Sequence, residues 1–281
     1  MTDVSATWRL SGFGDEIDPE PAVQVAVLRA LGAEHIEVRS AWRTNIADLD
    51  DAQLGGLAAI LKSAGASVSA VASPIGKVGV FSDLELEAAR LARVIDAARV
   101  LGTDRIRVFS FFLEDREATA TRDAVLTGME RFARIAAASG VTLLHENEKA
   151  IYGDTPERIL DIIESVGSPS LRVAWDSANF VQVGVDRPHD RGYVLLRPYL
   201  DYLQVKDAQA ATGAVVPAGH GDGQVAETVR ALAADGYSGF ASLEPHLAAA
   251  HELGGFSGPA AFGDAARAFR GIAEANGVEL R

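Results

Sequence analysis

Short hydrophobic runs alternate along the chain with longer segments in which apolar residues recur every three or four positions. The short runs have the length of buried β-strands, and the longer segments have the period of amphipathic helices. Eight such alternations follow one another, which is typical of an α/β fold with a parallel sheet. The predicted strands are residues 8–13, 35–40, 67–73, 105–111, 141–146, 171–176, 201–206 and 239–244.

The segments between the strands carry helix signals of unequal strength. Segment 83–102 places its apolar residues on one helical face. Segment 155–167 opens with a threonine in the N-cap position and with Pro156 at the first helical position. Segment 190–200 is the weakest predicted helix, because Pro198 interrupts it near its end.

Two architectures fit this alternation: a closed (β/α)₈ barrel and an open, doubly wound sheet. An open sheet usually carries a glycine-rich phosphate-binding turn after its first strand. Here the first strand leads into GFGDEIDPEP, whose acidic residues would face a pyrophosphate. No linker or low-complexity segment divides the chain. We therefore expect residues 1–281 to form a single (β/α)₈ TIM barrel.

The last four predicted strands end in side chains that can bind a cation. These are Glu146, Asp176, Gln204 and Glu244, each about one strand–helix unit after the previous one. Side chains alternate along a strand, and strand ends of a barrel meet at one mouth, so all four should point inward together. Three carboxylates brought so close would repel one another unless a cation neutralised them. A divalent metal site follows, with His145 facing outward under the helix layer rather than serving as a ligand.

Several segments then resemble a known family. LLHENEKAIYGDTPER, WDSANF, QVKDA and GYSGFASLEPHL, together with SGFGDEI, IEVR and SPIGKV, resemble conserved segments of the sugar phosphate isomerase/epimerase family of xylose isomerase-like TIM barrels. The resemblance implies a Glu–Asp–His–Glu set that binds Mn²⁺, Mg²⁺, Co²⁺ or Zn²⁺, and this set maps onto Glu146, Asp176, Gln204 and Glu244. It also implies that Glu146 and Glu244 act as general base and general acid around an enediolate.

The chain departs from that family pattern at Gln204, where the family normally has histidine. An amide oxygen binds hard cations but is a poor Zn²⁺ ligand, so we expect Mn²⁺ or Mg²⁺ rather than Zn²⁺. One hypothesis is that His220, in the glycine-rich loop after strand seven, swings over the site and supplies the missing nitrogen. The competing interpretation is that His220 is an exposed loop residue.

Other residues are expected to contact substrate. Lys206 shares the inward face of Gln204 and could hold a substrate oxygen or phosphate, or could instead form a salt bridge to Glu148 or Asp176. His246 shares the parity of Glu244. The full set of predicted substrate-binding residues is Lys206, His220, His246, Glu37, Arg39, Trp42 and Lys77.

Composition narrows the class of function. A net charge of −13 with no basic run disfavours nucleic-acid partners, and the absence of cysteine excludes thiolate metal sites. The first residues lack a basic region followed by an apolar stretch, and no window has the apolar length of a membrane span. The expectation is a cytoplasmic protein. The apolar segment 246–263 could cover the barrel mouth or contact a second copy, so a homo-oligomer is also considered.

The expected function is a metal-dependent sugar or sugar phosphate isomerase/epimerase of carbohydrate metabolism. Three alternatives stay open. A keto-polyol dehydratase (an inosose dehydratase-like lyase) forms the same type of enolate. The endonuclease branch of the superfamily is disfavoured by the charge and by the six histidines, most of which lie away from the predicted site. A non-catalytic sugar-binding relative would retain the barrel with a decayed metal site.

Overall fold

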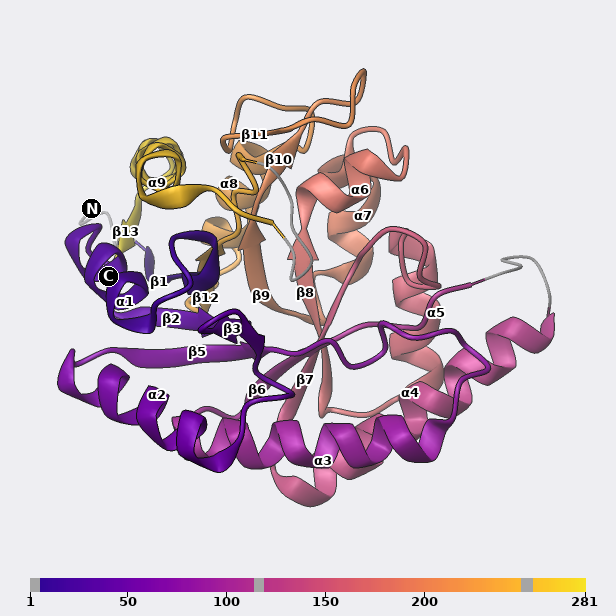
Figure 1. Cartoon of the computed structure of the whole chain (residues 1–281). Coiled ribbons are helices and arrows are strands. Elements are labelled where there is room, and N and C mark those ends of the chain that lie inside the picture. Colours follow the sequence, from indigo (N-terminus) through magenta and orange to yellow (C-terminus); the bar gives the residue numbers. More distant parts are fainter. Residues whose placement is uncertain (1–5, 114–118, 249–254) are drawn as a thin grey trace.

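The computed structural model describes residues 6–113, 119–248 and 255–281, and it shows a curled parallel sheet surrounded by helices (Figure 1). All eight predicted strands are confirmed, with ends that differ from the prediction by at most three residues. They are β1 (Ala6–Gly12), β2 (His35–Val38), β5 (Ser67–Ala72), β6 (Arg105–Val108), β7 (Thr142–Glu146), β8 (Leu171–Asp176), β9 (Leu200–Val205) and β12 (Phe240–Leu243).

The sheet closes into a barrel. Its strands pair in the order β1, β12, β9, β8, β7, β6, β5, β2, and the strand pairs are parallel. An isolated parallel bridge between Phe13 and Glu37 joins the end of β1 to β2. A further strand, β13 (Val278–Leu280), pairs with the first half of β1 and was not predicted from the sequence. The (β/α)₈ architecture expected from the alternation is thus confirmed.

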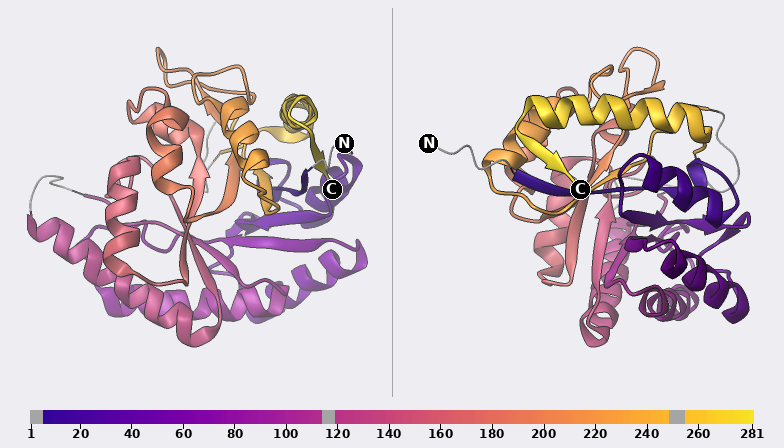
Figure 2. Two further views of the ribbon diagram at one scale, coloured as in Figure 1. Left: turned by 180° about the vertical axis from the view of Figure 1, so that it is seen from behind. Right: turned by 90° about the vertical axis from the view of Figure 1, so that its left-hand side faces the viewer.

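Helices cover the outside of the barrel (Figure 2). Thr155 and Pro156 occupy the N-cap and first helical positions as predicted, and the weakly predicted helix is present but ends two residues before Pro198. The long outer helices are α1 (Pro21–Ala30), α2 (Asp51–Ser63), α3 (Leu84–Leu101), α4 (Thr119–Ser139), α5 (Pro156–Val166), α7 (Pro188–Leu196), α8 (Val225–Ala234) and α9 (Gly258–Ala275). No helix in the described ranges is long and apolar enough to cross a membrane.

Shorter elements follow several strands at the C-terminal mouth. They are the 3₁₀ helix η1 (Gly14–Glu16), the helix α6 (Ser177–Gln182), and two antiparallel pairs, β3 (Ser40–Ala41) with β4 (Thr44–Asn45) and β10 (Asp207–Ala208) with β11 (Val215–Val216). None of these was predicted from the sequence, because each is too short to show a clear period.

The apolar core has two main layers. The larger layer packs the outer face of the strands against the helices. A smaller cluster fills the barrel interior and contains Leu144, Ala174 and Tyr202, with Ala70 and Phe240. Because side chains alternate along a strand, the residues two positions after Leu144, Ala174 and Tyr202 point to the same interior, closer to the mouth. Those residues belong to the predicted site.

Candidate functional site

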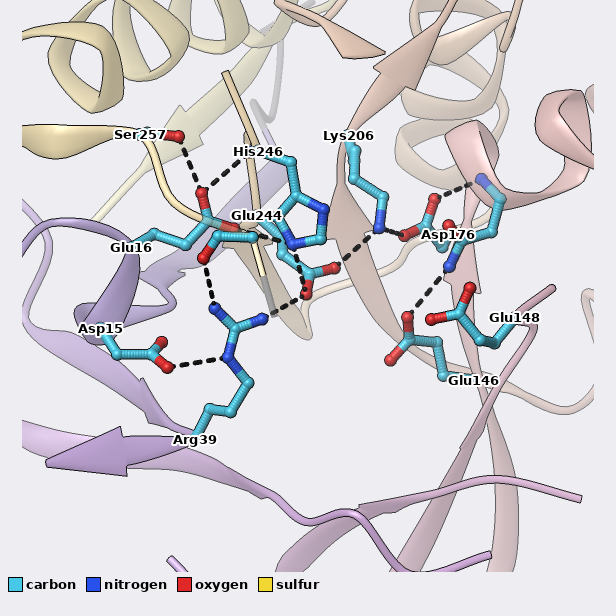
Figure 3. Close-up of polar contacts among 12 residues, drawn as sticks. Asp15, Glu16, Arg39, Glu146, Glu148, Asp176, Lys206, Glu244, His246 and Ser257 are labelled. Carbon is cyan, nitrogen blue, oxygen red and sulfur yellow. Dashed lines mark hydrogen bonds and ion pairs between the residues drawn. The ribbon is translucent and has the colours of Figure 1, made fainter. Parts of the chain in front are cut away.

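Three of the four predicted ligands, Glu146, Asp176 and Glu244, converge at the C-terminal mouth of the barrel (Figure 3). Glu146 ends β7, Asp176 ends β8, and Glu244 directly follows β12. Each is at most 2% exposed, and one oxygen from each lies within 4.8 Å of the others. Gln204 on β9 is paired in register with Asp176 and is also buried. The four residues therefore lie together at the mouth of the barrel, where their positions at the strand ends predicted them.

The amide of Gln204 is available to a ligand. Neither its oxygen nor its nitrogen has a hydrogen-bond partner within the described part of the chain. A buried amide without a hydrogen-bond partner destabilises the folded protein, and an ion bound to its oxygen would offset part of that cost. Three carboxylates and an amide oxygen are hard donors, which suit Mg²⁺ or Mn²⁺. The residues present thus fit a divalent ion of this type.

Cationic side chains already contact the three carboxylates. The Lys206 Nζ lies 2.7 Å from Asp176 Oδ2 and 3.0 Å from Glu244 Oε2. Arg39 Nη1 lies 3.1 Å from Glu244 Oε1, and Arg107 Nη1 lies 3.0 Å from Glu146 Oε2. The repulsion expected among the carboxylates is therefore reduced by neighbouring ammonium and guanidinium groups.

Burial and these cations shift the pKa values in opposite directions. Burial raises the pKa of Glu146 to about 8 and that of Asp176 to about 6, although Arg107 and Lys206 respectively oppose the rise. Burial also acts on Glu244, but Lys206 and other cationic neighbours outweigh it and hold its pKa well below the usual value. The two glutamates therefore differ strongly in how readily they hold a proton.

Two asparagines orient the carboxylates. Asn147 pairs with the backbone of Asp176 through both its amide nitrogen (2.8 Å) and its amide oxygen (3.0 Å). The backbone N–H of Asn179 donates to Asp176 Oδ1 (2.9 Å), and its side-chain amide donates to Glu146 Oε1 (3.1 Å) and to the carbonyl of Asn147 (2.8 Å). The ENE and WDSAN segments thus act as one unit that fixes where Glu146 and Asp176 point.

Lys206 is a buried residue of the site. Burial alone would lower its pKa, but Asp176, Glu244, Glu146 and Glu148 outweigh burial and raise it well above the usual value. Of the two roles considered for Lys206, the structure shows the ion pair with Asp176, and it adds the pair with Glu244. In Figure 3 its ammonium lies between these two carboxylates.

A second acidic group adjoins Glu244. The Nε2 of His246 lies 3.1 Å from Glu16 Oε1 and 3.2 Å from Glu244 Oε1. Glu16 Oε2 accepts hydrogen bonds from the backbone N–H of His246 and from the hydroxyl of Ser257, both at 2.8 Å. Burial raises the pKa of Glu16 to about 8. His246, a predicted substrate-binding residue, is therefore brought to the site and held by Glu16.

Arg39 and Lys77 are also placed close to the site. Arg39 is buried and donates from Nε to Asp15 Oδ2 (2.8 Å) and from Nη2 to the carbonyl of Gly255 (3.0 Å). Lys77 is partly exposed, with its Nζ 3.1 Å from Glu148 Oε2. Figure 3 shows Glu148 beside Glu146 and Asp176. Both basic residues are thus linked to the acidic cluster by direct contacts.

Three predicted residues lie elsewhere. Glu37 sits deeper in the barrel, where its Oε2 accepts a hydrogen bond from the Tyr202 hydroxyl (2.9 Å). Trp42 packs its ring against the outer core and donates its backbone N–H to a carbonyl before α1. His220 is exposed, and the structure gives its backbone N–H a bond to Pro217. The structure brings neither Trp42 nor His220 to the carboxylates, and a swing of His220 over the site stays a prediction.

His145 lies outside the barrel, as predicted from its parity. It is fully buried, and burial lowers its pKa to about 3. Its ring packs under Gly153, where an added Cβ would come 2.5 Å from the ring. Neither ring nitrogen has a hydrogen-bond partner among the described residues.

The sequence interpretation missed several residues of the candidate site, notably Asp15, Glu16, Arg107 and Asn179. Arg107 had a usable signal: a charged residue inside the short hydrophobic strand RIRVFSF, in register with the inward-facing Leu144. Asp15 and Glu16 lie in the GDE segment after the first strand, which the sequence did not link to a particular contact in the site. Part of segment 246–263, residues 249–254, lies outside the described residues.

Comparisons with known proteins agree with this architecture. A family model described as xylose isomerase-like TIM barrel matches residues 25–278. The chain is 28% identical over 237 residues to 2-epi-5-epi-valiolone 7-phosphate 2-epimerase from Actinoplanes sp., covering 80% of this chain and 79% of that protein.

Solved structures share the fold at low identity. A xylose isomerase-like TIM barrel protein from Mycobacterium smegmatis, in complex with magnesium, has a TM-score of 0.69 at 18% identity, covering 98% of this chain and 99% of that chain. A probable 3-DHS dehydratase from Bacillus anthracis has a TM-score of 0.72 at 17% identity, covering 94% of this chain and 98% of that chain. By the match of the family model along most of its length, this chain belongs to the xylose isomerase-like TIM barrel family.

Proposed function

We propose that the protein is a divalent-metal-dependent isomerase or epimerase of a sugar or sugar phosphate. The observation that carries this proposal is the convergence of Glu146, Asp176 and Glu244 at the barrel mouth, beside the amide of Gln204, which has no hydrogen-bond partner among the residues that the structure describes. Active sites of TIM barrels form at this end of the strands. The relative from Actinoplanes, named as an epimerase of a phosphorylated substrate, supports the same class of reaction.

Glu146, Asp176, Gln204 and Glu244 would hold the ion, and an ion there would polarise a substrate carbonyl. Moving a proton on the neighbouring carbon needs one group to remove it and another to return it. Glu146 and Glu244 come from β7 and from the end of β12, the outer two of the four neighbouring strands that carry the cluster, and we assign them these two tasks. His246, Arg39 and Lys206 would position substrate oxygens, because their polar groups already meet at Glu244.

Further residues are proposed to bind substrate at the mouth, although they contact the three carboxylates less directly. Lys77 would attract an anionic group, since its ammonium is partly exposed beside Glu148. Glu37 lies deeper in the barrel and would influence the site through the hydrogen bond that it accepts from the Tyr202 hydroxyl. Trp42 and His220 stay proposed contacts of the substrate.

A keto-polyol dehydratase is the second candidate. The specific observation in its favour is the fold shared with the probable dehydratase from Bacillus anthracis. Proton removal next to a carbonyl is common to both reactions, so the same glutamates could serve either one. The reactions differ in product mass, because a dehydratase releases water.

Metal analysis is the first test of the proposal. Purified protein, before and after reconstitution with Mn²⁺, should hold about one ion per chain, and the Glu146→Gln variant should hold much less, because a neutral amide replaces a charged ligand. Elemental analysis gives the ratio. An Arg134→Gln variant, altered on the outer helix α4, controls for handling.

Activity then follows with a panel of ketoses and their phosphates. The expected result is exchange of one carbon-bound hydrogen with deuterated solvent and a product of unchanged heavy-atom composition. Loss of one water would identify the dehydratase. Absence of metal under both conditions would contradict the proposal and favour a binding protein with a decayed site.

A further inference from the structure

Lys206 contacts two of the three carboxylates to which the proposed function assigns a metal ion. Its side chain is 2% exposed, and its Nζ contacts Asp176 Oδ2 at 2.7 Å and Glu244 Oε2 at 3.0 Å. The residue lies just after β9, two positions beyond Gln204, so its side chain enters the same interior as the predicted ligand. A buried ammonium at this place is itself a counter-ion for the cluster.

The oxygens that Lys206 contacts are those left free by the other partners. Asp176 Oδ1 accepts the backbone N–H of Asn179, which leaves Oδ2. Glu244 Oε1 is shared by Arg39 and His246, which leaves Oε2. The same ammonium takes both remaining oxygens. An ion that entered between these carboxylates would have to share those oxygens with a positive charge or displace it.

Repulsion makes sharing unfavourable. A divalent ion approaches carboxylate oxygens to about 2.0–2.6 Å. Lys206 Nζ would then stand within a few ångströms of the ion in a buried site, where screening by water is weak. Asp176 and Glu244 would lose part of their attraction for either cation. Exclusive occupancy by one cation at a time follows.

A second carboxylate, that of Glu148, can accept the displaced ammonium beside its present partners, which are Lys77 on Oε2 (3.1 Å) and the backbone N–H of Lys149 on Oε1 (2.8 Å). Glu148 lies beside Glu146 and Asp176 in Figure 3, and it interacts electrostatically with both Lys206 and Lys77. Its side chain is 19% exposed, so it borders both the cluster and the mouth.

We propose that Lys206 and a divalent ion occupy the Asp176–Glu244 pair in alternation, with Lys206 moving to Glu148 when the ion enters. Lys206 is then a positioning residue. Its ammonium offsets negative charge of the carboxylates when no metal is bound, and competition with it lowers the affinity of the site for the metal. After metal entry its ammonium faces the mouth, where it can contact an anionic substrate group. This inference rests on the metal site of the proposed function.

The wild-type protein permits a direct test, because the chain has four lysines: Lys62, Lys77, Lys149 and Lys206. Protein labelled with ¹⁵N at the lysine Nζ atoms should give a protected Lys206 ammonium signal in the metal-free state. The signal is assigned with Lys206→Arg. Titration with Mg²⁺ should shift or broaden this signal along the binding curve that calorimetry gives for the same ion, while Lys62 stays unchanged. Mg²⁺ binding without any response of Lys206 would overturn the proposal.

Metal affinity gives the second test. Lys206→Met, which keeps an unbranched side chain only one atom shorter and removes the charge, should bind Mn²⁺ at least about tenfold more tightly than wild type, the size of effect that one neighbouring charge has on a buried site. Lys149→Met removes an exposed charge from the neighbouring loop and should leave the affinity within about twofold. Equal affinity of Lys206→Met and wild type would contradict the proposal while leaving the metal site intact.

Glu148 is tested by a double-mutant cycle. Glu148→Gln should weaken Mn²⁺ binding several-fold in the wild-type background and much less in Lys206→Met, since the acceptor matters only when the ammonium must move. Equal weakening in both backgrounds would overturn the transfer to Glu148. No Mn²⁺ or Mg²⁺ binding to wild type and Lys206→Met alike would instead reject the metal site itself. If Lys206→Met does not fold, Lys206→Gln and the wild-type titration decide the question.

Discussion

At the scale of single residues, the parity of each strand decides which side chains reach the site. Glu146, Asp176 and Gln204 follow the interior residues of their strands by two positions, and sequence alternation alone predicts their direction. The contacts of His246 could not be predicted this way. Its backbone has φ of 46°, a left-handed conformation that no periodic pattern encodes, and its carboxylate partner Glu16 comes from the other end of the chain.

Removal of the Asn179 side chain should disturb the orientation of the carboxylates while leaving all of them in place. Its side chain donates to Glu146 Oε1 and to the carbonyl of Asn147. Asn179→Ala should lower Mn²⁺ affinity about 10–100-fold, the usual effect of losing a group that orients a ligand. It should also destabilise the protein by about 1–3 kcal/mol, because two buried acceptors lose their donor.

Titration with Mn²⁺ and denaturant unfolding measure these two quantities. Gln182→Ala is the matched control, since Gln182 ends the same short helix and donates to Gly213 on a loop. An Asn179→Ala variant with metal affinity equal to that control would show that the carboxylates are oriented without it.

At the scale of elements, the glycine-rich loop after β9 is organised by its own carboxylate. Asp207 accepts backbone N–H groups from Gly219, Gly221 and Gly223, at 2.9–3.1 Å, and from Ala208 at 2.9 Å. A Cβ on Gly221 would come 2.4 Å from Asp207 Oδ1. Converging N–H groups of this kind otherwise bind phosphate. Here the anion belongs to the chain, which agrees with the absence of a clear phosphate motif in the sequence.

Asp207→Asn should loosen this loop. The amide keeps the shape of the side chain but turns an NH₂ group toward backbone N–H donors, so we expect a loss of about 2 kcal/mol in the free energy of unfolding. Faster hydrogen exchange at the three glycines should accompany it. Asp222→Asn is the control in the same loop, because Asp222 accepts from Ala210 alone among the hydrogen bonds of the described residues. Equal effects of the two changes would show that Asp207 has no special role.

At the scale of the whole molecule, the alternation of strands and helices predicts a parallel sheet whose faces are covered by helices, which fits both a barrel and a doubly wound sheet. The acidic segment after the first strand, in place of a glycine-rich phosphate-binding turn, is what favours the barrel. Closure depends on finer features. The bridge between Phe13 and Glu37 involves one residue on each side, and β13 is three residues long, so neither has a sequence period to detect.

Glu37 also anchors a hydrogen-bonded chain through the barrel interior. Its Oε2 accepts the Tyr202 hydroxyl, which contacts Ser69 Oγ at 2.8 Å, and Ser69 Oγ contacts Ser11 Oγ at 2.7 Å. The chain therefore connects β2, β9, β5 and β1 across the axis. Burial of Glu37 raises its pKa to about 7, above the value of 4.5 for an unfolded chain. The polar interior thus makes barrel stability depend on pH.

The sign of that dependence follows from proton binding. Between pH 4.5 and 7 the folded protein holds the Glu37 proton and the unfolded chain has lost it, so this group makes stability fall as pH rises through that window. Glu37→Gln cannot lose a proton. Relative to this variant, wild type should therefore lose about 3 kcal/mol of stability between pH 4.5 and pH 7, at about 1.4 kcal/mol per unit of pKa.

Urea unfolding of metal-free protein at several pH values measures the difference. Glu34→Gln, on the exposed residue just before β2, controls for the loss of one carboxylate and should run parallel to wild type. A constant difference between wild type and Glu37→Gln across the range would mean that Glu37 keeps an ordinary pKa inside the barrel. In that case the hydrogen bond from the Tyr202 hydroxyl would stabilise the buried Glu37 carboxylate as well as water stabilises it in the unfolded chain.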